Sequence, residues 1–266
     1  VQVVEAQATP DPDFSTVKSP NPESQAAFAL AEELGRKVGA DVLVATDPDA
    51  DRVGVEVLQK DGSYLNLSGN QIGAIMAKYI LEAHKNAGTL PENAALCKSI
   101  VSTDLVTKIA ESYGATMFNV LTGFKFIAEK IQEFEEKHNH TYMMGFEESF
   151  GYLIKPFVRD KDAIQAVLVV AELAAYYRSR GLTLADGIEE IYKEYGYYAE
   201  KTISVTLSGV DGAEQIKAIM AKFRNIAPKE WNATAITVVE DFKAQTATDA
   251  DGTVTNLTTP PSDVLK

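Results

Sequence analysis

The stretch that decides the fold of this chain is residues 41–52, which read DVLVATDPDADR. Its first part is an apolar run that predicts a buried strand. Three carboxylates follow at alternate positions, Asp47, Asp49 and Asp51, and like charges this close repel one another strongly. A hard cation such as Mg²⁺ or Ca²⁺ neutralises such a cluster through oxygen ligands, and open α/β sheets bind ligands at the carboxyl ends of their strands. The pattern therefore favours a cation site at a strand end.

Three interpretations of this acidic loop compete. An EF-hand requires Gly at its sixth position and Glu at its twelfth, whereas this chain has Arg52 and Leu58 there, so the EF-hand is excluded. The second interpretation is a solvated acidic turn between two strands. The third is a Mg²⁺ site for phosphate chemistry, in which Arg52 contacts a phosphate beside the metal. The loop by itself leaves the second and third open.

Four short segments bear on the choice. They follow one another along the chain as residues 47–52 (DPDADR), 122–126 (TGFKF), 145–152 (GFEESFGY) and 159–162 (RDKD). The first resembles the metal-binding loop of the α-D-phosphohexomutases, the phosphoglucomutase and phosphomannomutase superfamily, although many members have Gly in place of Pro48 and Ala50. The second resembles another loop of that family, the third its sugar-binding loop, and the fourth a basic segment of its phosphoglucomutase branch. Four matches in the family's order make coincidence a poor explanation.

The resemblance implies roles for individual side chains. The metal ligands for Mg²⁺ that it implies are Asp47, Asp49 and Asp51. It implies catalytic roles for Arg52 and Lys125, and for the lysine it leaves open a phosphate contact or proton transfer. The substrate-binding residues that it implies are Glu147, Ser149, Thr122, Gly123, Arg159 and Lys161. Ordinary interpretations stay open beside these roles, because the glutamate and Lys125 could be solvated charges and the two basic residues of 159–162 could pair with the acids next to them.

The same resemblance implies an enzymatic activity and indicates which of the family's domains this chain would cover. The family moves a phosphoryl group between C1 and C6 of a hexose, through a phosphoserine and a hexose 1,6-bisphosphate. Glucose phosphate is favoured over mannose phosphate by the loop at 145–152 and the segment at 159–162, and a pentose phosphate stays open. Of four family domains, residues 1–67 would be the C-terminal half of the second, 68–198 the third and 199–266 the start of the fourth. The phosphoserine segment is not in this sequence, so we expect a fragment that is inactive without the remaining domains.

Two other function classes are weighed against the mutase. A non-catalytic module that binds sugar phosphate or Mg²⁺ would use the same residues and stays open. A haloacid-dehalogenase-like phosphatase also has closely spaced aspartates on a strand. Its nucleophile motif, however, does not fit the order Asp-Pro-Asp-Ala-Asp of this chain.

The composition limits the classes of partner that the chain can be expected to bind. The chain has 266 residues, of which 45% are hydrophobic, enough for a substantial core and for about two domains. Its 38 acidic residues against 25 Lys and Arg give a net charge of -13, which argues against nucleic acid as a partner. Cys97 is the single cysteine, so no disulfide forms within the chain. We find no signal peptide and no apolar run of about 18 residues, which favours the cytoplasm and no membrane partner.

Alternating apolar patterns predict an α/β fold with mixed, mostly parallel sheets and flanking helices, in one complete domain plus two partial ones. A strand at 1–4, a helix from Pro22 to Gly39 capped by Asn21, and the strand before residue 47 would form a βαβ unit. Ser68 and Thr183 should cap two further helices. The other predicted strands lie at 53–58, 64–67, 96–101, 116–120, 142–146, 202–207 and 235–240. One further predicted helix begins at residue 102, 103 or 104, and three others span 124–138, 163–178 and 213–223.

Overall fold

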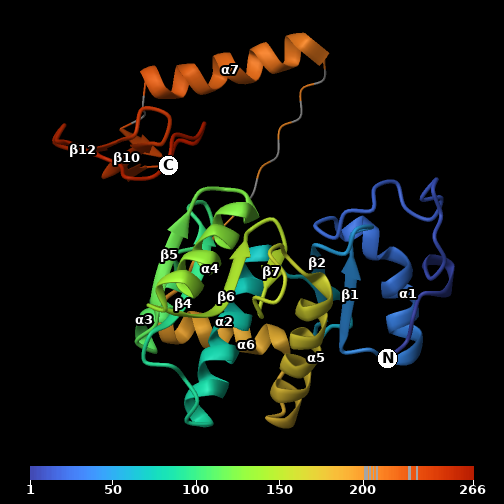
Figure 1. Ribbon diagram of the computed structural model, residues 1–266. Coiled ribbons are helices and arrows are strands. Elements are labelled where there is room, and N and C mark those ends of the chain that lie inside the picture. The colour runs from blue at the N-terminus through green and yellow to red at the C-terminus, as the bar shows by residue number, and fades with distance from the viewer. Residues whose placement is uncertain (201–202, 204, 206, 208, 227–228, 232) are drawn as a thin grey trace. The chain divides into compact units, whose positions relative to one another are not determined.

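The computed structural model describes residues 1–266 except 201–202, 204, 206, 208, 227–228 and 232 (Figure 1). The chain divides into two compact units, residues 1–198 and residues 199–266. The first unit contains two sheets with their helices and carries every residue to which the sequence assigned a role. In the part of the chain that is described, no helix is both long enough and apolar enough to cross a membrane.

The N-terminal sheet of the first unit is an antiparallel meander. Its strands lie in the order β1-β2-β3 and span Val42–Thr46, Val53–Leu58 and Tyr64–Asn66. Thr46 pairs with Val53, so the acidic loop connects two neighbouring strands directly. Such a short connection allows only antiparallel pairing. The expected βαβ unit is wrong for a separate reason, because residues 1–4, its predicted first strand, form no strand.

The first helix begins later than expected. Asn21 Oδ1 accepts the N–H of Glu23 at 2.9 Å, which makes a local turn instead of a helix cap. A 3₁₀ turn at Gln25–Phe28 then leads into α1, Ala29–Val38, so the predicted start at Pro22 is wrong. The helix ends as expected at Gly39, whose φ of 69° is left-handed. Phe28, at the start of α1, is fully buried against the meander.

The second sheet is mixed and mostly parallel, in the order β5-β4-β6-β7. Its strands span Ala94–Ser99 (β4), Thr116–Val120 (β5), Thr141–Glu147 (β6) and Gly151–Leu153 (β7). Strand β4 is parallel to both β5 and β6, and only β7 runs antiparallel to its neighbour. The predicted fold class, α/β with mixed and mostly parallel sheets, is confirmed. Parallel strands need helical crossovers, which accounts for the alternation of helices and strands in the sequence.

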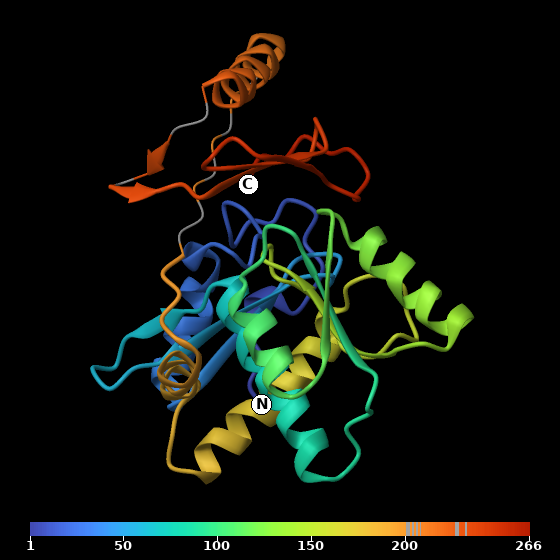
Figure 2. The same ribbon diagram turned by 90° about the vertical axis from the view of Figure 1, so that its left-hand side faces the viewer.

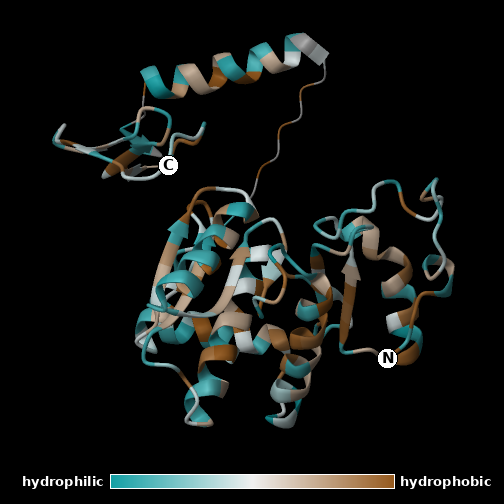
Figure 3. Cartoon of the chain, in the orientation of Figure 1, coloured by the Kyte–Doolittle hydropathy of each residue, from teal (hydrophilic) through white to brown (hydrophobic). Residues whose placement is uncertain are grey.

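Helices cover both faces of the second sheet (Figures 1 and 2). They span Gly69–Asn86 (α2), Leu105–Ser112 (α3), Phe124–Lys137 (α4), Ala163–Ser179 (α5) and Leu184–Tyr195 (α6). The main core lies on the face covered by α2 and α3, and α4 covers the other face with a smaller cluster. Leu96 of β4 belongs to the first cluster and Cys97 to the second, because successive side chains of a strand point to opposite faces. Figure 3 shows the outward side of α4 as hydrophilic, as a helix with one buried stripe requires.

The helix caps predicted at Ser68 and Thr183 are confirmed. Ser68 Oγ accepts the N–H of Gln71 at 3.2 Å, and Gln71 Oε1 accepts the N–H of Ser68 at 2.9 Å. Thr183 and Asp186 form the same reciprocal box at the start of α6. Each box satisfies N–H groups that have no partner within the helix, so it fixes where the helix begins.

The second unit contains α7, Gly209–Asn225, which includes the predicted helix at 213–223. Two of its strands form a small hairpin, β8 (Glu230–Trp231) and β9 (Thr234–Ala235), and the other three form an antiparallel sheet, β10 (Val238–Asp241), β11 (Thr246–Asp249) and β12 (Val254–Asn256). Only parts of the predicted strand at 235–240 belong to strands, and the strand predicted at 202–207 lies outside the residues that are fully described. Arg224 joins α7 to β10 through an ion pair of its Nε with Asp241 Oδ1 at 3.1 Å.

Strand β2 carries a buried carboxyl group that the acidic loop does not use. Glu56 is fully buried between α1 and the meander, where its Oε1 accepts a weak bond from Asn66 at 3.4 Å and its Oε2 has no described hydrogen-bond partner. Burial raises the pKa of Glu56 to about 7, and the negative charge of Glu32 on α1 adds to the shift. The folded protein therefore keeps this carboxyl group protonated up to a higher pH than the unfolded chain does.

We expect Glu56 to make the first unit less stable as the pH rises. Between pH 5.5 and 7 this carboxyl group is already ionised in the unfolded chain but still holds most of its proton in the folded chain, so the free energy of unfolding should fall by about 1–2 kcal/mol more in the wild type than in Glu56→Gln. Urea unfolding at both pH values measures the difference. Glu33→Gln, on the exposed side of α1, is the control and should follow the wild type. Parallel pH profiles for the wild type and Glu56→Gln would contradict the prediction.

Candidate functional site

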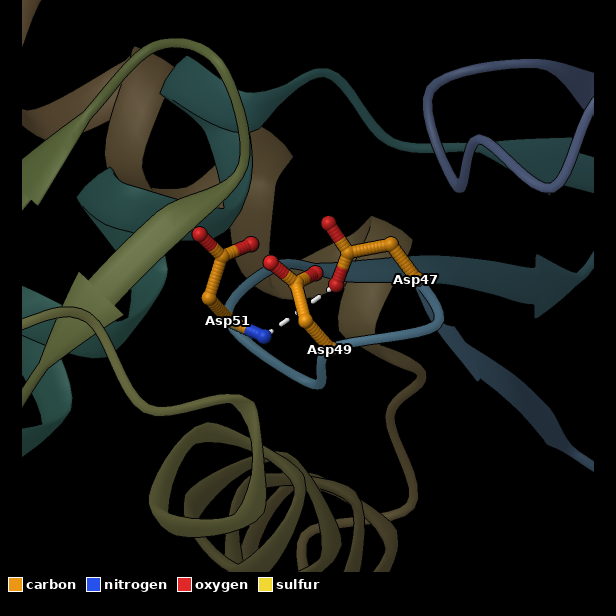
Figure 4. A group of neighbouring side chains, drawn as sticks. All are labelled: Asp47, Asp49 and Asp51. Carbon is orange, nitrogen blue, oxygen red and sulfur yellow. Dashed lines mark hydrogen bonds between the residues drawn. The ribbon is translucent and has the colours of Figure 1, made fainter.

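The acidic loop brings its three carboxylates together. One oxygen from each of Asp47, Asp49 and Asp51 lies within 4.8 Å of the others, and Figure 4 shows the three side chains gathered above the turn. The chain reverses at Ala50, whose φ of 54° lies in the left-handed region that a β-carbon disfavours. The N–H of Ala50 donates to the carbonyl of Asp47 at 3.0 Å, which closes the turn. The fold thus holds three like charges within reach of one cation.

Asp47 is the buried and preorganised member of the trio. Its Oδ1 accepts the N–H groups of Asp51 at 3.1 Å and Arg52 at 3.0 Å, and its Oδ2 accepts Arg52 Nε at 2.7 Å. Burial opposes ionisation, but these bonds from Arg52 and its charge outweigh the burial and lower the pKa of Asp47. The carboxylate is therefore ionised at neutral pH, as a metal ligand must be.

Asp51 differs from Asp47 in its surroundings. Burial raises the pKa of Asp51, and an ion pair of its Oδ2 with Lys161 Nζ at 2.8 Å offsets only part of that shift. Its other oxygen, Oδ1, is buried and has no described hydrogen-bond partner. A buried carboxylate oxygen that accepts no described hydrogen bond, beside two further carboxylates, is a donor set that fits a hard divalent cation.

Arg52 is held within the acidic loop and its surroundings. Besides Asp47, its guanidinium pairs with Glu23 Oε1 at 3.0 Å and lies 3.7 Å from Asp51 Oδ1. The guanidinium therefore balances part of the charge of the trio. Its predicted contact with a phosphate stays a prediction.

The predicted sugar-binding loop follows β6 and meets the loop that follows β5. Glu147, at the end of β6, is buried, and its Oε1 accepts the N–H of Gly123 at 2.6 Å. Burial raises the pKa of Glu147, although the bond from Gly123 opposes the shift. Thr122 is exposed beside this contact, and Ser149 is half-buried two residues beyond the glutamate. Two segments 24 residues apart thus meet at the carboxyl edge of the parallel sheet, where such folds bind ligands.

A network that the sequence did not predict supports this loop. Glu148 Oε2 accepts the hydroxyls of Ser99 at 2.7 Å and Ser102 at 2.9 Å, and the N–H of Glu148 donates to Ser102 Oγ at 3.0 Å. The two glutamates of the loop therefore have different surroundings, since Glu148 is tied to the end of β4 while Glu147 faces Gly123. The only signal in the sequence was that Ser99 lies within the strand predicted at 96–101 and Ser102 directly follows it.

Backbone contacts join the sugar-binding loop to the acidic loop. Arg52 forms a β-bridge with Gly151, and the N–H of Val53 donates to the carbonyl of Phe150 at 3.0 Å. The N–H of Ala163, at the start of α5, donates to the carbonyl of Ala50 at 3.0 Å. Loops about a hundred residues apart in the chain therefore lie side by side within the first unit.

The remaining predicted basic residues lie in different surroundings. Lys161 joins the acidic trio through Asp51, as described above. Arg159 instead pairs with Glu135 of α4 and donates to the carbonyl of Pro156 at 2.6 Å, so its described partners lie outside the acidic loop. Lys125, in the first turn of α4, is exposed, with its Nζ 4.8 Å from the ring centroid of Phe126. Of these cations, only Lys161 is brought to the trio.

An α/β fold that places three carboxylates, neighbouring cations and a buried glutamate at the ends of its strands belongs to the class of α/β proteins that bind their ligands at that edge. The particular family follows from comparison with known proteins. The family model described as phosphoglucomutase/phosphomannomutase, alpha/beta/alpha domain III, matches residues 68–195, and the model for domain II matches residues 1–60. The chain belongs to this family, the α-D-phosphohexomutases.

Individual relatives agree with this membership. Phosphoglucomutase from Staphylococcus aureus (strain bovine RF122 / ET3-1) is 38% identical over 265 residues, which cover 99% of this chain and 47% of that protein. The phosphoglucomutase of Staphylococcus epidermidis is 38% identical over 266 residues, which cover 100% and 48%. The chain spans about half the length of the curated relatives it matches.

Solved structures support the fold. A putative phosphomannomutase from Thermus thermophilus is 26% identical, with a TM-score of 0.55 over 70% of this chain and 38% of that one. The phosphoglucomutase pp63/parafusin from Paramecium, in its open form, is 19% identical, with a TM-score of 0.56 over 93% of this chain and 41% of that one. The second likeness bears on the fold alone.

Proposed function

We propose that this chain is the metal- and sugar-binding part of a phosphohexomutase. The full-length protein would interconvert hexose 1-phosphate and hexose 6-phosphate, with glucose favoured, through a phosphoserine and a hexose 1,6-bisphosphate. The observation that carries the proposal is the direct connection of the acidic trio, through Arg52 and Val53, to the loop that bears Glu147. Besides the sugar phosphates, the partners of this chain would be the remaining domains of the same protein. Without those domains the chain would not convert substrate. The cytoplasmic location stays a prediction.

The trio Asp47, Asp49 and Asp51 would hold Mg²⁺. When bound, that ion would offset negative charge on the phosphoryl group during transfer. The chain's own residues prepare the site: Arg52 keeps Asp47 ionised and fixes its orientation by hydrogen bonds to the same carboxylate. The ion pair of Arg52 with Glu23 holds the guanidinium at the acidic loop. There it would donate a charge-assisted hydrogen bond to a phosphate oxygen, and such bonds are stronger than neutral ones.

The sugar would be held at the other loop. Glu147 would accept hydrogen bonds from sugar hydroxyls and Ser149 would donate to them, because a carboxylate offers only acceptors and a hydroxyl offers both. The bisphosphate must bind in two orientations, so hydroxyl contacts that serve both are worth more than contacts to one end. Thr122 and Gly123 would line the same edge, and Lys161 with Arg159 would bind phosphate. For Lys125 a phosphate contact or proton transfer would suit its exposed position.

The assay that tests the proposal uses the full-length protein. Glucose 1-phosphate, mannose 1-phosphate and ribose 1-phosphate are supplied side by side, with and without Mg²⁺. We expect the highest kcat/KM with glucose 1-phosphate and loss of turnover when the metal is removed. A protein that binds the sugar phosphates but converts none of them would be a non-catalytic module. A preference for mannose or ribose phosphate would keep the family and change the substrate.

Glu147→Ala in the full-length protein should chiefly weaken sugar binding. Its carboxylate is the proposed acceptor for sugar hydroxyls, and unpaired hydroxyls cost about 1–3 kcal/mol, which corresponds to a rise in KM of roughly 5- to 150-fold. Substrate titrations measure the change. Glu136→Ala, on the exposed side of α4, is the control and should leave KM unaltered. A wild-type kcat/KM for Glu147→Ala would remove the glutamate from the site.

A further inference from the structure

Lys161 reaches the acidic loop from a segment more than a hundred residues away in the chain. Its Nζ lies 2.8 Å from Asp51 Oδ2 and 3.3 Å from Asp160 Oδ1, and only 19% of its side chain is exposed. Its stem passes so close to Gly151 that a β-carbon there would lie 2.5 Å from Lys161 Cδ. The ammonium is therefore directed to Asp51 by packing as well as by charge.

A divalent cation in the trio would compete with this ammonium. The two oxygens of Asp51 have different surroundings. Oδ2 pairs with the ammonium at 2.8 Å, while the buried Oδ1 accepts no described hydrogen bond and lies 3.7 Å from Arg52 Nε. All three carboxylates offer oxygens within 4.8 Å of one another. A doubly charged ion and an ammonium on the same carboxylate repel each other strongly at such separations.

We propose that Lys161 is the resident counter-ion of the acidic loop and that a divalent cation displaces its ammonium from Asp51. The inference rests on the proposed metal site and adds a coupling to it. Displacement makes the ammonium available to an anionic group of a sugar phosphate only once the metal is bound. Metal and sugar phosphate therefore bind with positive cooperativity, and the empty loop avoids its own charge repulsion.

The surroundings of Lys161 fit an exchange of this kind. Asp160 is already a second partner and is exposed, so the displaced ammonium keeps a counter-charge and gains water. Its Nζ also lies 5.8 Å from the ring centroid of Phe124, the residue after Gly123, whose N–H holds Glu147. The freed ammonium thus lies beside the sugar-binding loop. Arg52 is less suited to exchange, because three carboxylates hold it.

Mn²⁺ binding to the 266-residue chain tests the competition. The free ion is counted by electron paramagnetic resonance for the wild type, Lys161→Gln and Lys155→Gln, with circular dichroism to verify folding. We expect Lys161→Gln to bind Mn²⁺ about fivefold or more tightly, because one like charge has gone. Lys155→Gln removes an exposed charge from the same loop and should match the wild type. Equal or weaker binding by Lys161→Gln overturns the inference while the metal site stands. Absence of Mn²⁺ binding in the wild type and both variants overturns both.

Acetylation of the wild-type chain tests the displacement without a substitution. Acetic anhydride modifies the free amine of lysine, and mass spectrometry follows each site with time. Saturating Mg²⁺ should speed modification of Lys161 several-fold, since its ammonium leaves the ion pair. Lys155 should react at the same rate with and without the ion. An unchanged or slower rate at Lys161, in a chain shown to bind the metal, overturns the inference.

Discussion

Asp49→Ala in the full-length protein is expected to reduce phosphoryl transfer by about a thousandfold while leaving the fold intact. Asp49 is the exposed member of the trio, and no hydrogen bond or ion pair joins its side chain to any residue that the structure describes. Removal of one of three proposed ligands costs several kcal/mol of charge stabilisation in the transition state, and each 1.36 kcal/mol is about tenfold in rate. The expected loss therefore falls on turnover and spares the free energy of unfolding.

Two further variants separate the metal role from a structural one. Asp47→Ala should also lose turnover, but with about 2 kcal/mol of stability, because Arg52 and two backbone N–H groups lose their acceptor. Asp13→Ala removes an exposed aspartate elsewhere in the first unit and should change neither quantity. Turnover with Mg²⁺ and urea unfolding are measured on all three. If Asp49→Ala turns over like the wild type, the trio does not hold the catalytic metal.

The parts of the site that lie close in sequence could be predicted from the sequence. The acidic trio gathers within one turn, and the boxes at Ser68 and Thr183 need only residues three positions away. The edge at which the loops open also follows, because parallel strands present their carboxyl ends together. Local features of this kind can be predicted from the spacing of residue types along the sequence.

Long-range contacts could not be predicted in the same way. The ion pair of Asp51 with Lys161 depends on how the two sheets of the first unit are placed, and the hydrogen bond of Glu148 with Ser99 depends on β6 lying beside β4. No periodicity in the sequence indicates either arrangement. The predicted βαβ unit failed for a related reason. An apolar run at residues 1–4 resembles a strand, yet strand pairing needs a partner that single-sequence patterns do not identify.

Gly69 is a further requirement that only the structure reveals. It is the first residue of α2, directly after the cap Ser68, and its carbonyl accepts the hydroxyl of Tyr152 at 2.8 Å. A β-carbon at this position would lie 2.0 Å from the carbonyl oxygen of Glu148 and 3.1 Å from the backbone nitrogen of Phe150. The start of the helix thus packs directly on the backbone of the sugar-binding loop, and no flexible side chain separates the two.

Gly69→Ala is therefore expected to displace the sugar-binding loop. The overpacking should cost about 1–3 kcal/mol of unfolding free energy, and a shift of roughly 1 Å at Glu147 and Ser149 should lower kcat/KM by about a hundredfold. Urea unfolding and substrate titration of the full-length protein measure the two effects. Gly187→Ala is the matched control. Gly187 lies in α6, and a β-carbon there would lie 2.5 Å from the ring of Tyr177 in α5, so this variant should lose stability without a change in kcat/KM. Should both variants lose stability alike and keep wild-type kcat/KM, the packing of α2 would have no part in positioning the loop.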